Sequence, residues 1–349
     1  MTLRTEVAQI IDHGGSLDRA RMRFPDAREP WVDLSTGINP HSYPQLDLPR
    51  DIFTRLPEPL RSTELCRVAA RNYHAPSPAN VVAAPGTQIL LPRVMSLVKP
   101  GRALVLAPTY AEHIRAAAIA GHRSNYVGTF EALFDADLAV VVNPNNPDGR
   151  IVERAKLREL AYHMQSKGGL LVVDEAFMDV GPQQASLASE VEACRAIVLR
   201  SFGKFFGLAG IRLGFALAPQ DLAQRLDDEL GPWAVSGPAM EIGIAALCDE
   251  VWQNTMRRRL SEEVGQLDRV LGKAGLSPIG GTSLFRFVET QFAKAIFDAL
   301  GRAGILVRGF QDLPGALRFG LPAGTNDLGR LDLALQKIAA TRNSGVAAE

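Results

Sequence analysis

The chain has 349 residues, 46% of them hydrophobic, and its 38 lysines and arginines are balanced by 38 aspartates and glutamates. This length suits one large globular domain with a smaller companion. The charge balance excludes a global field that would attract nucleic acid or an anionic membrane, so we expect neither partner. No apolar run is long enough for a membrane span, and the amino terminus lacks a signal-peptide core.

The three cysteines, Cys66, Cys194 and Cys248, are far apart in the sequence and form no Cys-x-x-Cys pair. This spacing argues against a disulfide framework and against a structural zinc, so we expect no metal. A reducing cytoplasm is the predicted location.

The amino-terminal part of the chain holds two predicted segments. Residues 1–45 contain too little apolar sequence to fold alone, so we expect an arm that joins the small domain or the cleft. Residues 51–73 have a helical pattern. They open the predicted large domain, residues 46–240.

From about Asn80 short apolar runs alternate with amphipathic stretches of helical period. This alternation predicts an α/β fold with a mostly parallel sheet flanked by helices. Helices are expected to begin near Thr87, Thr109 and Glu153. The predicted strands are Val81–Ala84, Ala103–Leu106, Leu138–Val142, Leu170–Val173, Ala196–Leu199 and Leu213–Leu217.

The carboxy-terminal third, residues 241–349, is predicted to form a linking helix and a small α+β domain. A long helical pattern runs from Pro238 to about Ala274, with an interruption near Asp249. The remainder follows the order strand, helix, strand, strand, helix.

Lys204 lies in a glycine-rich stretch that directly follows an apolar strand. This is how a Schiff-base lysine would be presented to pyridoxal phosphate. A lone lysine in such a loop is ordinarily a solvated surface residue, so its neighbours decide between the two interpretations.

Asp174 ends the buried run Leu170–Val173, where a carboxylate without a cationic partner would be costly. A protonated pyridine nitrogen would supply that partner and keep the ring an electron sink. The alternative is that Asp174 caps the following segment.

A phosphate site is predicted near the lysine. The segment Gly86-Thr87-Gln88 follows a strand and opens a helix, so its N–H groups and the helix dipole would favour a phosphate. The segment is neither a dinucleotide fingerprint nor a Walker loop, which argues against those ligands. Ser201 and Arg212 flank Lys204 closely enough to reach the same phosphate, although Arg212 is alternatively a surface ion-pair residue.

Two further residues follow predicted strands, and the carboxyl ends of parallel strands meet at one edge of a sheet. Asn146 lies in the turn Asn145-Asn146-Pro147-Asp148-Gly149 and could donate a hydrogen bond to the phenolate oxygen of the cofactor; alternatively it is an ordinary turn residue. Tyr110, in Pro108-Thr109-Tyr110, could stack on the ring or belong to the core.

Taken in chain order, these residues resemble the fold-type I pyridoxal-phosphate enzymes, the aspartate aminotransferase superfamily, over nearly the whole chain. The resemblance implies a homodimer with active sites at the interface, pyridoxal 5'-phosphate as cofactor, Lys204 as its covalent partner, and a small domain built from both chain ends. The turn at 145–149 and the runs at 174–177 and 210–214 are most similar to the histidinol-phosphate aminotransferase branch.

Several positions depart from the aminotransferases of that branch. Phe177 and Leu56 stand where many of them have tyrosines, which argues against pure transaminase behaviour. The segments His13-Gly14-Gly15, 31–40, 108–113 and 232–235 instead resemble the threonine-phosphate decarboxylases of cobalamin biosynthesis.

That resemblance implies decarboxylation of L-threonine O-3-phosphate, a phosphorylated amino acid, to (R)-1-amino-2-propanol O-phosphate. Arg308 and Arg318 match substrate-binding arginines of the family, and Asn146 is also expected to contact substrate. The residues His13 and Gly14 would close over the substrate.

Gly37 stands where the decarboxylases can have an asparagine that touches substrate, so that contact is expected to be absent or remade. Which cation binds phosphate and which binds carboxylate stays open, as does the use of serine phosphate. Two other functions are also open: a histidinol-phosphate or related aromatic aminotransferase, and a non-catalytic cofactor-binding regulator or scaffold.

Overall fold

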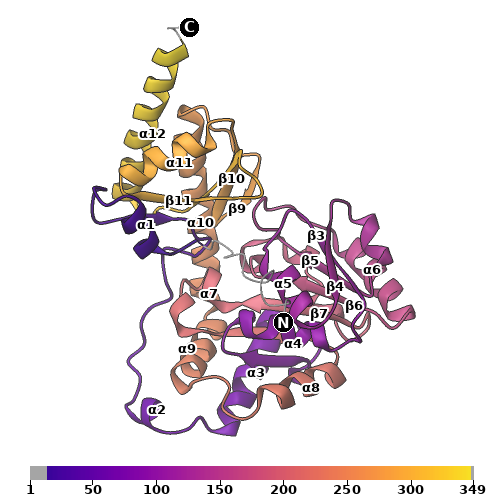
Figure 1. Ribbon diagram of the computed structural model, residues 1–349. Helices are drawn as coiled ribbons and strands as arrows, with labels where there is room; N and C mark the ends of the chain where they lie inside the picture. The colour runs from indigo at the N-terminus through magenta and orange to yellow at the C-terminus, as the bar shows by residue number, and fades with distance from the viewer. Residues whose placement is uncertain (1–13, 347–349) are drawn as a thin grey trace, which may run out of the picture. The chain divides into compact units, whose positions relative to one another are not determined.

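The computed structural model describes residues 14–346, which divide into two compact units (Figure 1). The large unit comprises Ile38–Gln266 and Ile279–Arg286, and the small unit comprises the described residues up to Gly37, Leu267–Pro278 and those from Phe287 onward. These bounds differ from the predicted divisions after residues 45 and 240.

The later division arises because helix α9 (Gly237–Cys248) belongs with the large unit. It packs on α3 (Pro59–Tyr73), and Asn72 Nδ2 donates a hydrogen bond to Leu247 O at 3.0 Å. Helix α10 (Glu250–Lys273) begins directly after Asp249, where the sequence predicts the interruption, and runs on past the end of the large unit.

Within the described residues, the large unit holds a seven-stranded sheet in the order β2-β8-β7-β6-β5-β3-β4. Neighbouring strands are parallel except at β8, which is antiparallel to both β2 and β7. The predicted, mostly parallel sheet is therefore confirmed. The strands are β2 Val81–Ala84, β3 Arg102–Leu106, β4 Arg123–Val127, β5 Leu138–Val142, β6 Leu170–Asp174, β7 Ala196–Ser201 and β8 Gly214–Leu217.

Strand β4 is the one strand of this sheet that the sequence does not predict. It pairs with β3 at the sheet edge, and its residues are exposed or half-buried. An edge strand needs no apolar run, so the hydrophobic pattern that marks the central strands is missing here.

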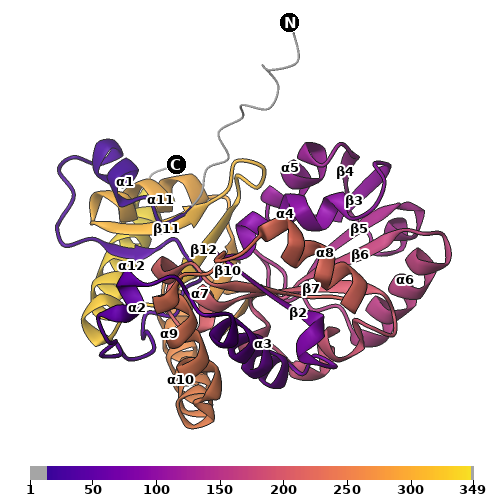
Figure 2. The same cartoon turned by 90° about the horizontal axis from the view of Figure 1, so that it is seen from below.

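Helices cover the sheet, and both strand faces are buried. Helices α4 (Thr87–Ser96), α5 (Glu112–Ile119) and α8 (Gln220–Leu230) lie beside the large sheet (Figure 2). Their apolar side chains join Val140, Val172 and other strand residues in one core. On the opposite face Ala139, Val141 and Val173 are equally buried. This two-sided burial explains why the central strands read as continuous apolar runs.

The remaining elements of the large unit are short apart from α6. Helix α8 is not predicted from the sequence, whereas α4, α5 and α6 begin close to the expected positions. Within residues 14–346, no helix combines the length and the apolar character needed to cross a membrane. The remaining helices and turns of the large unit are α2 Asp51–Thr54, α6 Arg154–Ser166, α7 Phe202–Phe205, and the 3-10 turns η1 Pro78–Asn80, η2 Glu131–Asp135, η3 Met178–Val180, η4 Gln183–Ala185, η5 Ala188–Glu190 and η6 Ala209–Ile211.

A second sheet has the order β1-β11-β12-β10-β9. Strand β1 of the amino-terminal arm pairs in parallel with β11, with Val32 opposite Ile305. The short strand β9 was not predicted, because the glycines Gly280-Gly281 interrupt any apolar pattern. The elements are α1 Leu17–Arg23, β1 Val32–Leu34, β9 Gly280–Thr282, β10 Phe285–Glu289, α11 Ala293–Arg302, β11 Ile305–Gly309, β12 Ala316–Gly320 and α12 Thr325–Val346.

Gly243 permits the close approach of α9 to its neighbours, so we expect Gly243→Ala to be destabilising. A Cβ atom there would lie 2.6 Å from Leu213 Cδ2 and 3.1 Å from Leu65 Cδ1. Overpacking of this kind costs about 1–3 kcal/mol. Gly265→Ala in α10 is the matched control, because a Cβ there meets no atom within 4 Å. It should stabilise by roughly 0.5–1 kcal/mol through helix propensity.

Urea unfolding of both variants measures the two free energies. Shifts of the same sign and size would contradict the packing assigned to Gly243.

Candidate active site

The carboxyl ends of β2, β3, β5, β6 and β7 meet at one edge of the large sheet, because these strands run in the same direction. Asp174 is opposite both Val142 and Leu199, while Gly214 is opposite both Ala84 and Ser201. The antiparallel strand β8 begins at this same edge. The structure therefore gathers there every predicted cofactor-binding residue, namely Gly86, Thr87, Gln88, Tyr110, Asn146, Asp174, Ser201, Lys204 and Arg212.

Lys204 lies in the short helix α7 at the end of β7, and its Nζ is 5.8 Å from the centroid of the Phe177 ring. The Lys204 peptide oxygen accepts a hydrogen bond from Asn39 N at 2.9 Å, and the Asn39 side chain donates from Nδ2 to Phe205 O at 2.8 Å. Tyr43 N reaches Phe206 O at 2.8 Å. Residues 39–43 thus tether the helix that carries the lysine.

Asp174 is nearly buried, with 7% of its surface exposed, and has two hydrogen-bond partners. Its Oδ2 is 2.9 Å from His113 Nε2, and its Oδ1 accepts from Ala176 N at 3.0 Å. His113 is fully buried, and its Nδ1 has no hydrogen-bond partner among the described residues. A proton on Nε2 would let His113 donate a hydrogen bond to Asp174.

His113 was not predicted as a site residue. Its signal in the sequence is its position three residues after Tyr110, across the start of α5. The two rings make an edge contact with centroids 5.7 Å apart. Asp174 also accepts a hydrogen bond from Ala176 N, the contact that the capping alternative predicts.

Behind the site, a buried ion pair joins the strands that carry Asp174 and Lys204. Arg200 Nη1 lies 3.5 Å from Glu175 Oε2, and both side chains are at most 1% exposed. Burial raises the pKa of Glu175, while Arg200 lowers it. Glu175 also accepts hydrogen bonds from Ser186 Oγ at 2.6 Å and Leu187 N at 2.8 Å. These contacts satisfy the Glu175 carboxylate, whereas Arg200 Nε and Nη1 have no hydrogen-bond partner among the described residues, so burying the pair remains costly.

Gly86 and Arg212 form a cradle at the start of α4. Gly86 has a φ of +85°, and a Cβ there would lie 2.5 Å from Arg212 Nη2. Gly86 has no side chain to cap the first-turn N–H groups of α4, which are therefore available to an anion. A guanidinium beside a helix amino terminus is a chemical match for a phosphate.

The phosphate prediction concerns the backbone N–H of Gln88, and its side chain makes contacts of its own. Its Nε2 donates to Glu112 Oε2 at 2.7 Å, and its Oε1 accepts from Tyr110 OH at 3.2 Å. Gln88 therefore orients Tyr110 through its side chain, and only its backbone N–H is placed with the helix terminus.

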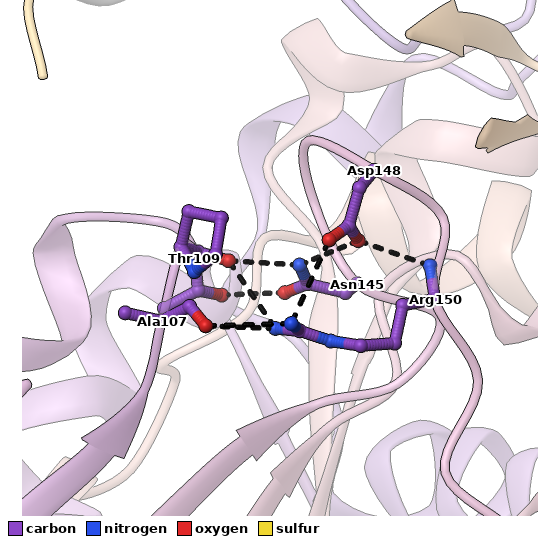
Figure 3. Close-up of polar contacts among 6 residues, drawn as sticks. Ala107, Thr109, Asn145, Asp148 and Arg150 are labelled. Atoms are coloured by element: carbon purple, nitrogen blue, oxygen red, sulfur yellow. Dashed lines mark hydrogen bonds and ion pairs between the residues drawn. The ribbon is translucent and has the colours of Figure 1, made fainter. Parts of the chain in front are cut away.

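The turn after β5 is joined to the loop after β3 by Asn145, the neighbour of the predicted residue Asn146 (Figure 3). Asn145 is 1% exposed, whereas Asn146 is half-buried. Asn145 Nδ2 donates to Pro108 O at 2.8 Å, and Thr109 Oγ1 donates to Asn145 Oδ1 at 2.7 Å. Asn145 therefore holds the two loops together, while the role of Asn146 in cofactor binding stays a prediction.

Arg308 and Arg318, in the small unit, are directly opposite each other on β11 and β12. Arg308 stands one residue before the end of β11, and Arg318 is in the middle of β12. Burial and then Arg308 lower the pKa of Arg318 to about 9, whereas Asp33 raises it. Two guanidinium groups side by side, one of them buried, favour a bound anion.

Ser35 connects Arg318 with Gly14. Arg318 Nη2 donates to Ser35 O at 2.8 Å, and Ser35 Oγ accepts from Gly15 N at 2.7 Å. A Cβ on Gly14 would lie 2.4 Å from Ser35 O. The predicted substrate residues Gly14 and Arg318 therefore share a neighbour that sequence reasoning missed; His13 lies outside the described residues.

The three departures from the family pattern have different surroundings. Phe177 is 4% exposed and packs edge-on against Phe285, with centroids 5.0 Å apart. Leu56, after α2, is 63% exposed. Gly37 is buried and ends the first segment of the small unit.

The groups at the sheet edge match the parts of pyridoxal phosphate. The Lys204 amine suits its carbonyl carbon, the Asp174 carboxylate suits its ring nitrogen, and the Gly86–Arg212 cradle suits its phosphate. The residues present therefore fit this cofactor.

Comparison with known proteins agrees with this fit. The family described as aminotransferase class I and II matches residues 59–338. A threonine-phosphate decarboxylase of Pseudomonas aeruginosa is 43% identical over 331 residues, which cover 93% of this chain and 97% of that protein. One from Sinorhizobium sp is 39% identical over 313 residues, covering 89% and 93%.

Among solved structures, histidinol-phosphate aminotransferase from Sinorhizobium meliloti, in complex with pyridoxal-5'-phosphate, has the same fold. Its TM-score is 0.81 at 22% identity, and the match covers 98% of each chain. The chain therefore belongs to the class I and II aminotransferase family.

Proposed function

We propose that this protein decarboxylates L-threonine O-3-phosphate to (R)-1-amino-2-propanol O-phosphate, a building block in cobalamin biosynthesis. The observation that carries the proposal is the Arg308–Arg318 pair, since the substrate has two anionic groups, a carboxylate and a phosphate. The similarity to two threonine-phosphate decarboxylases over most of the chain supports the same reaction.

The cofactor is pyridoxal 5'-phosphate, which when bound supplies an electron-withdrawing ring for the electron pair released as carbon dioxide leaves. Lys204 Nζ would hold it covalently, and the same nitrogen, when free, would carry a proton to the substrate Cα. Phe177 lies beside Lys204 Nζ and reduces its contact with water.

Three groups of side chains orient the cofactor. Asp174, fixed by His113, keeps a carboxylate beside the ring nitrogen. Arg212, Ser201 and the first turn of α4 hold the phosphate. Tyr110, oriented by Gln88, covers the ring, while Asn146 donates to its phenolate oxygen.

The substrate anions are held by cations of the small unit. Arg318 and Arg308 bind the carboxylate and the phosphate, with Gly14 and His13 of the arm closing over them and Asn146 contacting the amino acid. Because the chain has no net charge, this local pair must supply the attraction.

We also propose a cytoplasmic homodimer. Supporting the dimer, the large unit exposes three apolar side chains on and around α2 and α3: Phe53 at 64%, Leu56 at 63% and Leu60 at 80%. The three cysteines carry free thiols, as suits a reducing compartment. Burial raises the pKa of Cys66 and of Cys194 to about 11, so both stay protonated near neutral pH.

The proposed reaction predicts carbon dioxide release from threonine phosphate with no keto acid present. Wild-type protein loaded with pyridoxal phosphate should show turnover, and Lys204→Ala should show none, together with loss of borohydride-trappable cofactor. The assay measures carbon dioxide and aminopropanol phosphate. Amino transfer from histidinol phosphate to 2-oxoglutarate, without carbon dioxide release, would instead identify an aminotransferase. If the Lys204→Ala protein still supported cobalamin biosynthesis fully, the protein would instead be a non-catalytic scaffold.

Gly86→Ala is expected to weaken cofactor binding by about tenfold, because a Cβ at positive φ costs roughly 1–2 kcal/mol and displaces the Arg212 guanidinium. Titration of the apoprotein with pyridoxal phosphate measures the dissociation constant. Gly128→Ala serves as the control, since a Cβ there meets nothing within 4 Å. If both variants bound pyridoxal phosphate with equal affinity, the proposal that its phosphate binds in this cradle would be wrong.

Arg318→Met is expected to raise the KM for threonine phosphate on the order of 100-fold, through loss of a charge-assisted contact. In the folded protein the pKa of Arg318 is lowered to about 9. Keeping Arg318 charged therefore reduces the free energy of unfolding fully below pH 9, and this loss decreases as the pH rises above 9. Arg318→Met should therefore leave the apoprotein as stable as wild type or more stable at pH 7. Kinetics and thermal unfolding test both effects.

Exposed Arg302, at the end of α11, provides the control substitution Arg302→Met. An unchanged KM in Arg318→Met would exclude this arginine from substrate binding.

A further inference from the structure

Arg150 follows the turn after β5, and its guanidinium reaches across to the loop after β3 (Figure 3). Nη1 and Nη2 both donate to Ala107 O at 3.3 Å, and Nη2 also approaches Pro108 O at 3.4 Å. The planar fork of an arginine can serve two neighbouring carbonyls in this way, whereas the ammonium of a lysine cannot match its geometry.

Asp148 fixes the arginine from the other side. Its Oδ1 accepts from Arg150 N at 3.0 Å and from Asn145 Nδ2 at 2.7 Å, and its Oδ2 lies 3.7 Å from Arg150 Nη1. One carboxylate therefore holds both residues that reach the loop after β3. Together with the Thr109–Asn145 bond, these contacts form a closed polar brace.

Backbone packing holds the same turn from another direction. Gly149 has a φ of +73°, and a Cβ there would lie 2.1 Å from Gly281 O. A Cβ on Gly280 would lie 2.0 Å from Asp148 O. The strand β9 thus lies directly against the turn, and the backbone of the turn has little room to shift. Arg150 and Asp148 make the polar contacts of the same turn.

The brace spans the two proposed cofactor contacts. Tyr110 directly follows Thr109, and Asn146 directly follows Asn145, so the brace determines the spacing between the ring-covering side chain and the amide donor. Strands β3 and β5 pair directly, but their pairing ends before these loops begin. The sheet alone therefore does not determine where the two loops lie relative to each other.

We propose that Arg150, with Asp148, is a positioning residue that keeps Tyr110 and Asn146 at the separation the cofactor requires. This inference rests on the proposed pyridoxal-phosphate site, but not on the proposed substrate. Arg150 itself touches neither cofactor nor substrate in this scheme; it acts through the backbone of the loop that ends in Tyr110.

Arg154 provides a closely matched control, because its setting resembles that of Arg150 without any link to the site. Its side chain is 34% exposed, compared with 33% for Arg150. It donates to one backbone carbonyl, Gln184 O at 2.8 Å, where Arg150 donates to two, and like Arg150 it pairs with one carboxylate, here Glu190 at 3.7 Å. A purely structural loss should therefore be similar for the two arginines.

The experiment compares Arg150→Met, Arg150→Lys and Arg154→Met as full-length proteins. Titration of each apoprotein with pyridoxal phosphate gives the dissociation constant, and thermal unfolding without cofactor reports on stability. We expect Arg150→Met to weaken binding by about tenfold, Arg150→Lys by about threefold, and Arg154→Met by less than twofold. The melting temperatures of the two Met variants should agree.

Asp148→Asn extends the test, because the amide keeps the Oδ1 acceptor but loses the charge that orients Arg150. The affinity of Asp148→Asn for the cofactor should fall by about threefold, and its apoprotein should melt at the same temperature as the wild type. For the bound proteins, Arg150→Met should also shift the absorbance maximum of the cofactor, a signature that a merely structural change at Arg154 would not produce.

Two results would overturn the positioning role. One is wild-type cofactor affinity and absorbance in Arg150→Met. The other is a drop in the apoprotein melting temperature of Arg150→Met that Arg154→Met does not share. Neither readout uses threonine phosphate, so failure of the wild-type protein to release carbon dioxide would count against the proposed reaction alone.

Discussion

The parallel pairing of β5, β6 and β7 is the constraint on which the site depends. Parallel strands present their carboxyl ends at one edge, and Asp174 and the lysine-bearing helix α7 each follow directly from that edge. The buried Glu175–Arg200 pair sits just behind it and joins β6 to β7. A lysine and an aspartate 30 residues apart in sequence can then serve one ring, because their strands are hydrogen-bonded neighbours.

Electrostatics explains how a chain without net charge can bind anionic ligands. Two local groups of cationic residues are proposed to bind them, the Gly86–Arg212 cradle in the large unit and the Arg308–Arg318 pair in the small unit. Each uses a different device. The first adds a guanidinium to a helix amino terminus, and the second places like charges on adjacent strands, where a bound anion would reduce their repulsion.

The residues that hold the ligand-binding groups in place form a separate set. Asn39 tethers α7, His113 orients Asp174, Gln88 orients Tyr110, and Ser35 receives Arg318. Each makes its contact across a large sequence separation or through a backbone carbonyl. Such contacts depend on where the loops lie in space, so apart from the spacing of His113 from Tyr110 no local pattern in the sequence marks them.

Much of the fold and the cofactor site was determined by the sequence itself. The central strands are buried on both faces, which makes them continuous apolar runs, and Lys204, Asp174 and Gly86 each stand where such a run ends. Only the tertiary structure decided the edge strand β4, the course of α10 and the partners of Gln88 and Arg318. The physical reason is that burial leaves a periodic trace along the chain, whereas a hydrogen bond between distant loops leaves none.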